Sequence, residues 1–393
     1  MTTPSLALAG LRVVDLTDES GHLAGRILAD LGAEVLKIEP PDGAATRRRG
    51  PCLGGAPHPD AGAQWLARNR GKRSVVLDLA TDADRARLRA LVRTADVLAE
   101  NFAPNTLARL GLPIDELLRE RPELIVASVR GYGPDGPWSS YKSLDFVAQA
   151  TGGAMSVNGD ADGPPTRVGV TIADSGTGLH LAVGILSAIV RRARTGKGGR
   201  VQGYRGQRSG NFNRVGQTVQ QEIWPCQDGF VSFALRGGPA RIPGLIAITK
   251  YMDEHGMAPP VLKDRDWTKY NNNVLTQDEV DAIAAPFAAF FKTKTMQELY
   301  DAACSRRLML APANTEREIL QSRQLAARAY FTERAPSPAS GERVRLPARF
   351  AAFPLARVGE RAPALGDARG FDGSGFAPPR QTRAAPALAS SPA

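Results

Sequence analysis

Short apolar and β-branched runs alternate with segments of helical spacing along the first third of the chain. Strands are predicted at residues 11–16, 34–38, 74–79, 96–100 and 124–129. Helices are predicted between them at residues 23–31, 82–94 and 104–110, with Gly32 ending the first and Asp82 or Asp84 capping the second. Such alternation indicates βαβ crossovers in a buried parallel sheet, and therefore an α/β fold.

The pattern changes after the fifth predicted strand. Residues 144–150 have helical spacing, and residues 175–194 form a longer, mostly apolar helix that is expected to be buried. Residues 203–214 are basic and glycine-rich, which is typical of a linker or a binding loop. A smaller α+β domain is predicted from a strand at 230–235 and helices at 241–255, 277–292 and 295–306. Proline, alanine, glycine and serine dominate from residue 362, so 362–393 is expected to be a disordered tail.

Composition narrows the class of protein. The chain has 393 residues, of which 42% are hydrophobic and 23% charged, an ordinary soluble composition with room for two domains. The N-terminus lacks the basic start and apolar run of a secretory signal, and the apolar stretches are too short to span a bilayer. We therefore expect a cytoplasmic protein with no membrane segment.

The net charge of +10 and the sequence pI of about 9.8 suggest a polyanionic partner. Nucleic acid and a nucleotide cofactor with several phosphates are both candidates on charge alone. Basic residues are spread through the chain apart from clusters at 47–49 and 191–194, and no zinc-finger, RRM or KH pattern accompanies them. Nucleic-acid binding is therefore not expected. Cys52, Cys226 and Cys304 are too far apart to indicate a disulfide framework or a zinc site, so no metal is expected.

Asp174 lies where residues 168–172 meet the long apolar helix. Aspartate is a preferred helix N-cap, so capping is the simplest interpretation of this residue alone. The same position favours an ionised carboxylate, which can act as a nucleophile. Nearby Gly176 and Gly178 allow another backbone or a ligand to approach closely.

Other polar residues have two open interpretations. His180, on the apolar helix, is more simply a core histidine than a catalytic one. His22 follows the first strand, where a binding role and a surface role are both open. The basic loop at 69–74 can hold phosphate or be an ordinary solvated loop. Lys142 and Asp145 are spaced to form a surface ion pair across one helical turn.

Several blocks resemble the family III CoA-transferases. They are residues 11–16 (Leu-Arg-Val-Val-Asp-Leu), 28–35, 69–79, 95–102, 131–137, 163–169 and 172–178 (Ile-Ala-Asp-Ser-Gly-Thr-Gly). The likeness is collinear from residue 8 to about residue 200, and it returns more weakly at 295–299 and 311–328. No single block is specific, but their order is.

The resemblance implies a fold and an assembly. Members of this family have a Rossmann-like large domain, a small domain and a return of the chain to the large domain, and two subunits interlock like links. On this basis residues 1–202 form a large CoA-binding domain, 203–225 a linker, 226–330 a small α+β domain and 331–361 the return segment. A homodimer, or a heteromer with a related subunit, is the expected assembly.

The resemblance also implies a site and a reaction. Asp174 matches the family's catalytic aspartate, which attacks an acyl-CoA thioester and passes through an aspartyl anhydride and an aspartyl-CoA thioester. Positions that hold the CoA nucleotide in relatives match Lys72, Arg73, Asn101, Phe102 and Arg109, and Lys142 matches another active-site position. The pantetheine end and the reacting centre match the turn at Glu19, Ser20, Gly21 and His22. Coenzyme A is then a substrate that meets a small carboxylic acid, and no cofactor is tightly bound.

The α-methylacyl-CoA racemases share this fold and use a histidine with an aspartate as an acid/base pair. Their histidine falls at Leu144, just before Asp145. Leucine cannot transfer a proton, so the sequence disfavours a racemase.

Two departures from the family pattern leave a second hypothesis open. Relatives usually have a further segment after a position like Gln202, and the turn at 18–22 differs from their usual Ala-Gly-Pro type. The altered turn looks more like subunits of transferases that act on aromatic dicarboxylates such as benzylsuccinate. Asp18 and Glu19 would repel an acidic acceptor unless Arg or Lys offsets them. The alternative is therefore an inactive CoA-binding partner subunit in a heteromer.

Overall fold

The computed structural model describes residues 6–55, 58–158, 164–204, 214–215, 218–334, 343–348 and 362–368. The chain divides into two compact units. The larger unit comprises Met1–Asn158, Thr166–Arg208 and Ala327–Ala393. The smaller unit comprises Gly159–Pro165 and Ser209–Ala326.

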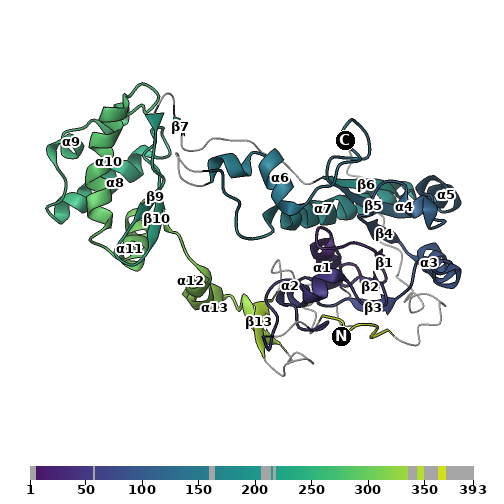
Figure 1. Ribbon diagram of the computed structural model, residues 1–393. Coiled ribbons are helices and arrows are strands. Elements are labelled where there is room, and N and C mark those ends of the chain that lie inside the picture. Colours follow the sequence, from purple (N-terminus) through teal and green to yellow (C-terminus); the bar gives the residue numbers. More distant parts are fainter. Residues whose placement is uncertain are drawn as a thin grey trace, which may run out of the picture. The chain divides into compact units, whose positions relative to one another are not determined.

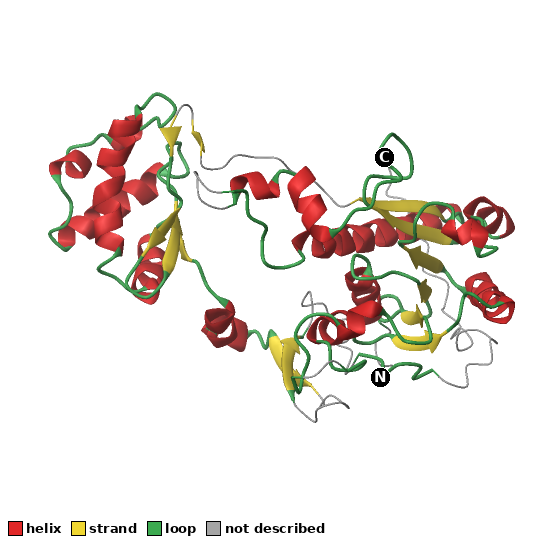
Figure 2. Ribbon diagram, viewed as in Figure 1, coloured by secondary structure: helices red, strands yellow, loops and turns green. Residues whose placement is uncertain are grey.

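A six-stranded sheet with the order β3-β2-β1-β4-β5-β6 forms the centre of the larger unit (Figures 1 and 2). Every neighbouring pair of its strands is parallel. The strands are β1 (Arg12–Asp15), β2 (Glu34–Glu39), β3 (Arg73–Val76), β4 (Val97–Glu100), β5 (Ile125–Arg130) and β6 (Gly199–Tyr204). The α/β fold and all five predicted strands are confirmed. The strand order reverses between β1 and β4, and the crevice beyond the carboxyl ends of two such strands is where open α/β sheets bind ligands.

Alternate residues of the buried strands supply two apolar layers. Val13 and Val35 face α1 (His22–Asp30) and α7 (Ile172–Thr195), whereas Val14 faces the opposite layer. That opposite layer contains α3 (Asp82–Thr94), α4 (Thr106–Arg109) and α5 (Ile114–Glu120). Helices therefore cover both faces of the sheet, which explains why its central strands are apolar on both sides.

Two local predictions in the larger unit were wrong. The cap of α3 is Thr81, not Asp82 or Asp84, because the Thr81 hydroxyl accepts a hydrogen bond from the Asp84 backbone N–H at 3.2 Å. Strand β6 was not predicted. It is an edge strand whose composition, Gly-Arg-Val-Gln-Gly-Tyr, lacks the apolar run that marks a buried strand.

Helix α7 is buried along one face only. Leu181 and Ile185 pack into the core, but Leu179 and Val183 are exposed. His180 is exposed too, so the prediction of a core histidine was wrong. By length and composition α7 is the one helix in the described part of the chain that could cross a membrane. One face of α7 packs against α1 and the sheet.

The remaining elements of the larger unit lie around the sheet. They are α2 (Ala63–Arg68), α6 (Asp145–Thr151), the 3₁₀ helices η1 (Ala45–Arg48) and η2 (Ala154–Val157), and the strands β12 (Phe331–Arg334) and β13 (Val344–Pro347). The last two pair as an antiparallel hairpin. Arg26 and the buried Arg70 each donate hydrogen bonds to the carbonyls of Pro347 and Ala348. These bonds tie the end of the hairpin to the first third of the chain.

The expectation of disorder from residue 362 does not hold for 362–368. The backbone N–H of Ala368 donates to the Ser74 carbonyl at 3.0 Å, and that of Gly366 donates to the Ser74 hydroxyl at 3.1 Å. The Pro363 carbonyl accepts from the buried Arg47 guanidinium at 3.1 Å. Edge strand β3 offers backbone groups that composition alone does not reveal. Residues 369–393 lie outside the described residues.

The smaller unit packs helices around an antiparallel sheet with the order β11-β10-β9. Its described elements are β7 (Arg214–Val215), β8 (Thr218–Val219), β9 (Ile223–Pro225), β10 (Phe230–Phe233), β11 (Leu310–Pro312), α8 (Ile242–Glu254), α9 (Pro260–Lys263), η3 (Trp267–Lys269), α10 (Gln277–Phe291), α11 (Met296–Arg306), α12 (Glu316–Gln321) and α13 (Arg323–Ala327), whose last residue lies in the larger unit. The predicted strand and three helices are found at β10, α8, α10 and α11. Part of the predicted linker 203–225 is strand, in β6 to β9, and residues 205–213 lie outside the described residues.

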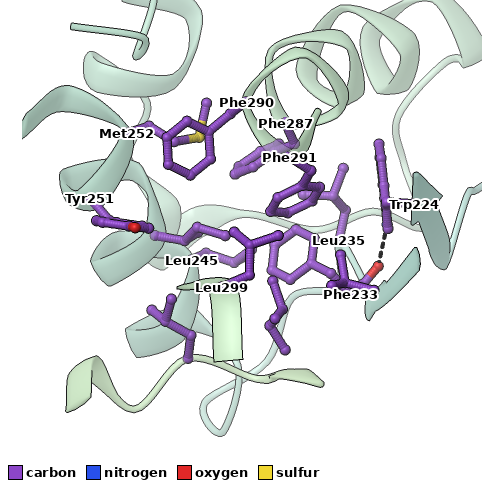
Figure 3. Packing of buried hydrophobic residues seen from close by; sticks show 14 of the residues in the cluster. Trp224, Phe233, Leu235, Leu245, Tyr251, Met252, Phe287, Phe290, Phe291 and Leu299 are labelled. Atoms are coloured by element: carbon purple, nitrogen blue, oxygen red, sulfur yellow. Dashed lines mark hydrogen bonds between the residues drawn. The ribbon is translucent and has the colours of Figure 1, made fainter. Parts of the chain in front are cut away.

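An aromatic cluster fills the core of the smaller unit (Figure 3). Phe287 and Phe291 point from α10 toward Trp224 and Phe233 of the sheet, whereas Phe290 packs against Tyr251 of α8. The Trp224 indole N–H is satisfied, because it donates to the Phe233 carbonyl at 2.6 Å. The smaller unit thus has its own core, as an independently stable domain requires.

Candidate active site

The turn after β1 is connected to the end of β4 at the reversal of strand order. The Asp18 backbone N–H donates to the Asn101 side-chain oxygen at 3.0 Å, and the Asn101 amide nitrogen donates to the Ser20 hydroxyl at 2.9 Å and to Asp18. Gly21 closes the turn against Thr17, whose side chain would lie 2.4 Å from an added Cβ. The predicted residues Ser20, Gly21 and Asn101 are therefore brought together at one edge of the sheet.

The buried ion pair between Lys72 and Asp15 holds this turn in place. The Lys72 ammonium donates to the Asp15 carboxylate at 2.8 Å, the Asn69 side-chain oxygen at 2.8 Å and the His22 carbonyl at 2.9 Å. Burial lowers the pKa of Lys72 to about 8, although Asp15 raises it. Burial alone would raise the pKa of Asp15, but Lys72 and Lys37 hold it well below its usual range.

Lys72, a predicted CoA contact, bonds to three oxygens of the protein itself. An ammonium has three N–H donors, and all three are occupied by protein oxygens in a side chain that is buried. Lys72 therefore has no donor for a CoA phosphate in this conformation. Its position explains Gly25 of α1, because an added Cβ there would lie 2.6 Å from the Asp15 carboxylate and 2.8 Å from the Lys72 nitrogen.

His22 is buried, so the surface interpretation was wrong. Its ring meets Trp65 edge-on, with centroids 5.4 Å apart, and its Nδ1 lies 3.4 Å from the Asn69 side-chain nitrogen. Burial lowers the pKa of His22 well below 6.5, and the charges of Lys72 and Lys37 lower it further. The imidazole is therefore neutral at physiological pH.

Two arginines offset the carboxylate of Glu19. Arg49 donates to it at 2.6 Å, and an Arg68 nitrogen lies 3.8 Å from its other oxygen. Positive charge that can offset the Glu19 carboxylate for an acidic acceptor is thus present. Arg68 was not singled out from the sequence, because one arginine at the end of an amphipathic helix gives no motif signal.

Arg68 also reaches the start of α7. Its NH2 group donates to the Thr171 hydroxyl at 2.6 Å and to the Ser175 hydroxyl at 3.1 Å. The backbone of α1 comes close to the same stretch, because a Cβ on Gly178 would lie 3.0 Å from the Leu23 Cβ and 3.5 Å from the Ser20 carbonyl. The turn after β1 and the first turns of α7 are therefore neighbours.

Asp174 lies in the first turn of α7 rather than at its cap. The helix begins at Ile172, three residues earlier than predicted, and Thr171 is the N-cap. The Asp174 side chain is 4% exposed. Its backbone N–H donates to the Asp145 carboxylate at 2.9 Å. The simple capping role for Asp174 is therefore wrong, and Asp145 supplies an acceptor for the helix end instead.

Helix α6 holds the segment that leads into α7. Gln149 donates to the Asp145 carboxylate at 2.6 Å, and its side-chain oxygen accepts from the Val168 backbone N–H at 2.9 Å. The predicted surface ion pair between Lys142 and Asp145 is not among the ion pairs of the described residues, because Asp145 faces α7 instead of Lys142. Leu144, at the racemase histidine position, is exposed and offers no proton.

Four further residues were predicted to contact CoA. Arg73 pairs with Glu34 at 3.1 Å, and Arg109 donates to Thr106 at 2.9 Å. The Phe102 backbone N–H donates to the Glu100 carboxylate at 2.8 Å, and Lys142 is exposed. The described part of the chain contains no group of three His, Cys, Asp or Glu side chains that could hold a metal ion.

Comparison with known proteins identifies the family to which this chain belongs. The sequence profile described as CoA-transferase family III matches residues 8–204 and 202–369. The chain belongs to CoA-transferase family III. The prediction made from the ordered motif blocks is confirmed.

Curated relatives within CoA-transferase family III match about half of the chain. A formyl-CoA:oxalate CoA-transferase of Streptomyces avermitilis is 42% identical over 197 residues, which cover 50% of this chain and 47% of the relative. An acetyl-CoA:oxalate CoA-transferase of Acetobacter aceti is 46% identical over 195 residues, 49% of each chain. The chain thus spans about half the length of the curated relatives it matches.

A solved structure extends the likeness over nearly all of the chain. A CAIB/BAIF family protein from Brucella suis is 28% identical with a TM-score of 0.73, over 93% of this chain and 98% of that one. The predicted fold, a parallel-sheet domain with a smaller α+β domain, is confirmed by this match and by the sheets described above.

Proposed function

We propose that this family III protein transfers CoA from an acyl-CoA donor to a free carboxylic acid, with Asp174 as the covalent nucleophile. The observation that carries the proposal is the placement of Asp174. Its buried side chain lies in the first turn of a 24-residue helix, next to the turn at the reversal of strand order. A helix N-terminus favours an anion, so the carboxylate stays available for attack.

The proposed reaction consists of four acyl exchanges. The Asp174 carboxylate attacks the donor thioester carbonyl, and CoA leaves as a thiolate, which gives a mixed anhydride of Asp174 and the donor acid. The thiolate then attacks the aspartyl carbonyl, which releases the donor acid and leaves an aspartyl-CoA thioester. The acceptor carboxylate attacks that thioester and displaces the thiolate again, and the thiolate finally attacks the acceptor acyl carbon to free Asp174. Each step breaks one acyl bond as another forms, so no oxidant or cofactor is needed.

The protein groups around Asp174 have separate proposed roles. Asn101, Ser20 and Gly21 line the approach of the pantetheine arm. The Lys72–Asp15 ion pair keeps the turn at residues 18–22 in place. We assign contacts with the CoA nucleotide to Arg73, Phe102, Arg109 and Lys142, of which Arg73, Arg109 and Lys142 are exposed. Small carboxylic acids are the proposed partners of CoA, since matched relatives are named for oxalate, mesaconate, succinate and glutarate.

A second candidate, an inactive CoA-binding partner subunit, has one observation in its favour. One match to the family profile ends at residue 204 and the other begins at residue 202. They overlap where a further segment, usual in relatives, is expected to be missing from this chain. We propose an active cytoplasmic homodimer as the first choice and a heteromer with a related subunit as the second. Transfer assays of the purified chain, alone and mixed with the product of a neighbouring related gene, separate the two. Activity of the chain alone supports the first.

We expect Asp174→Ala to abolish CoA transfer while CoA binding survives, because the nucleophile is lost but the nucleotide contacts remain. Exchange of labelled CoA and calorimetric titration of CoA check the two halves of this prediction. Asp82→Ala, at a carboxylate that is 96% exposed on α3, is the matched control and should keep full activity.

Covalent trapping gives the direct test. Incubation with the thioester followed by hydroxylamine or borohydride should modify the peptide that contains Asp174. Exchange that proceeds while this peptide stays unmodified would rule out the aspartyl intermediate.

A further inference from the structure

The guanidinium of Arg68 is anchored through one terminal nitrogen, and the other has no hydrogen bond among the described residues. Its NH2 group donates to Thr171 and Ser175, at 2.6 and 3.1 Å. Its NH1 group is buried from solvent, yet it makes no hydrogen bond to any residue in the described ranges. A buried charged donor without an acceptor costs free energy, so this nitrogen is suited to an acceptor that arrives from outside the chain.

Glu19 does not already fill that role. The Arg68 NH1 nitrogen lies 3.8 Å from one Glu19 oxygen, which is beyond hydrogen-bond distance. The other Glu19 oxygen accepts from Arg49 at 2.6 Å. Glu19 is therefore held by Arg49, and it places a compensating charge near Arg68 without using the Arg68 donor.

The chemistry of the missing acceptor follows from the donor and its position. A guanidinium binds carboxylate or phosphate with parallel N–H···O bonds. Ser175, which Arg68 contacts, directly follows Asp174 in the chain. The pantetheine arm keeps the phosphates of CoA far from the reacting thioester, so a group beside Asp174 meets the acid and not the nucleotide.

We propose that Arg68, anchored by Thr171 and Ser175, is the subsite that binds the carboxylate of the free acid substrate beside Asp174. This inference rests on the proposed CoA-transferase function. Arg68 selects for acids, and Glu19 competes weakly for the same charge. Removal of each side chain then has an opposite effect on acid affinity.

Calorimetric titration of acids into the CoA-saturated protein tests the subsite. The probes are oxalate, succinate, glutarate, acetate and benzoate. For the acid that the unaltered protein binds most tightly, Arg68→Met should weaken affinity about tenfold or more, as the loss of one charge-assisted hydrogen bond predicts. CoA affinity should change less than about twofold, which is under 0.5 kcal/mol. Glu19→Gln should tighten binding of the same acid.

Arg48→Met is the matched control, because Arg48 is exposed and bonds only to a backbone carbonyl among the described residues. It removes the same charge and should leave acid affinity unchanged. Unchanged acid affinity in Arg68→Met, an equal loss of CoA affinity, or no binding of any probe acid by the unaltered protein would overturn the subsite. If Arg68→Met does not fold, weaker acid binding by Glu19→Gln overturns it instead.

The two arms of the probe set distinguish which carboxylate is bound. If Arg68 contacts the reacting carboxylate, acetate and succinate lose affinity equally in Arg68→Met. If it contacts the second carboxylate, only the dicarboxylates lose affinity. Either pattern supports the subsite. Failure of the proposed function is recognised separately, as CoA binding without transfer to any acid by the unaltered protein.

Discussion

At the scale of single residues, buried charges organise the turn that carries the site. Asp15, Lys72 and Lys37 are all buried, and each is used by neighbours within the larger unit. Removing one member of such a group leaves an uncompensated charge, which typically costs about 3–5 kcal/mol. The cluster is therefore a fixed support for the turn and not a reserve of free cations for phosphate.

His22 should make the stability of the larger unit depend on pH below 6.5. The folded protein keeps the ring neutral because burial lowers its pKa, whereas the unfolded chain takes up a proton near 6.5. The unfolded state then binds more protons, so the free energy of unfolding falls as pH decreases. Between pH 7.5 and 5.5 the loss from this residue should be about 1 kcal/mol. Urea unfolding at the two pH values measures it.

Two variants check the assignment of that pH dependence. His22→Gln should flatten the change between pH 7.5 and 5.5 even if it lowers stability at both. His58→Gln, at an exposed histidine, should leave the change as it is. An undiminished pH dependence in His22→Gln would show that another group causes it.

At the scale of elements, the contact between α6 and α7 fixes the orientation of Asp174. Asp145 accepts the Asp174 backbone N–H, and Gln149 holds both Asp145 and the Val168 backbone. A first-turn amide has no partner within its own helix, so the acceptor from α6 completes the helix end. The short helix α6 thereby supports Asp174, the proposed nucleophile.

We expect Asp145→Ala to lower kcat about tenfold while the KM for acyl-CoA changes little, because loss of this acceptor lets Asp174 shift, and a small misplacement of a reacting group slows the chemical step. Asp145→Asn keeps an oxygen at the same place and should recover most of the rate. Steady-state kinetics of the two variants make the comparison. A loss confined to KM, or equal losses in both variants, would contradict a positioning role.

At the scale of the whole molecule, two separate cores divide the chain. The larger unit is built on two apolar layers around its sheet, and the smaller one on the aromatic cluster of α10 and β9–β10. Each unit buries its own apolar side chains. A destabilising substitution in one core should therefore lower the stability of that unit first.

Phe287→Ala should destabilise the smaller unit by about 3–5 kcal/mol, the usual cost of a large cavity in an aromatic core. Hydrogen exchange should accelerate across residues 218–326, with much less change in strands β1 to β5. Phe146→Ala, at a ring that is 49% exposed, is the control. Equal acceleration in both units would mean that they unfold as one.

The sequence predicts the buried parallel strands of this fold well. It predicts the edge strand, the helix start at α7 and the contacts between loops poorly. Strands β1 to β5 were found because apolar runs and β-branched residues mark buried parallel strands. Edge strand β6 was missed because it is half polar, and the early start of α7 was missed because its first turn bonds to Asp145 of α6, which is distant in sequence. The family blocks located Asp174, but Arg68 and the occupied donors of Lys72 are visible only once the loops are placed.

The return of residues 327–368 to the larger unit has a consequence for synthesis on the ribosome. Arg47 and Ser74 emerge early, but the carbonyl and amide groups that they bond in residues 363–368 are made only after residues 209–326. At about 5–20 residues per second, the 292 residues that separate Gly366 from Ser74 take about 15–60 seconds to synthesise. During that interval the backbone groups of edge strand β3 that residues 366–368 later bond have no partner. We expect chaperones that bind exposed strand edges to recognise β3 at this stage.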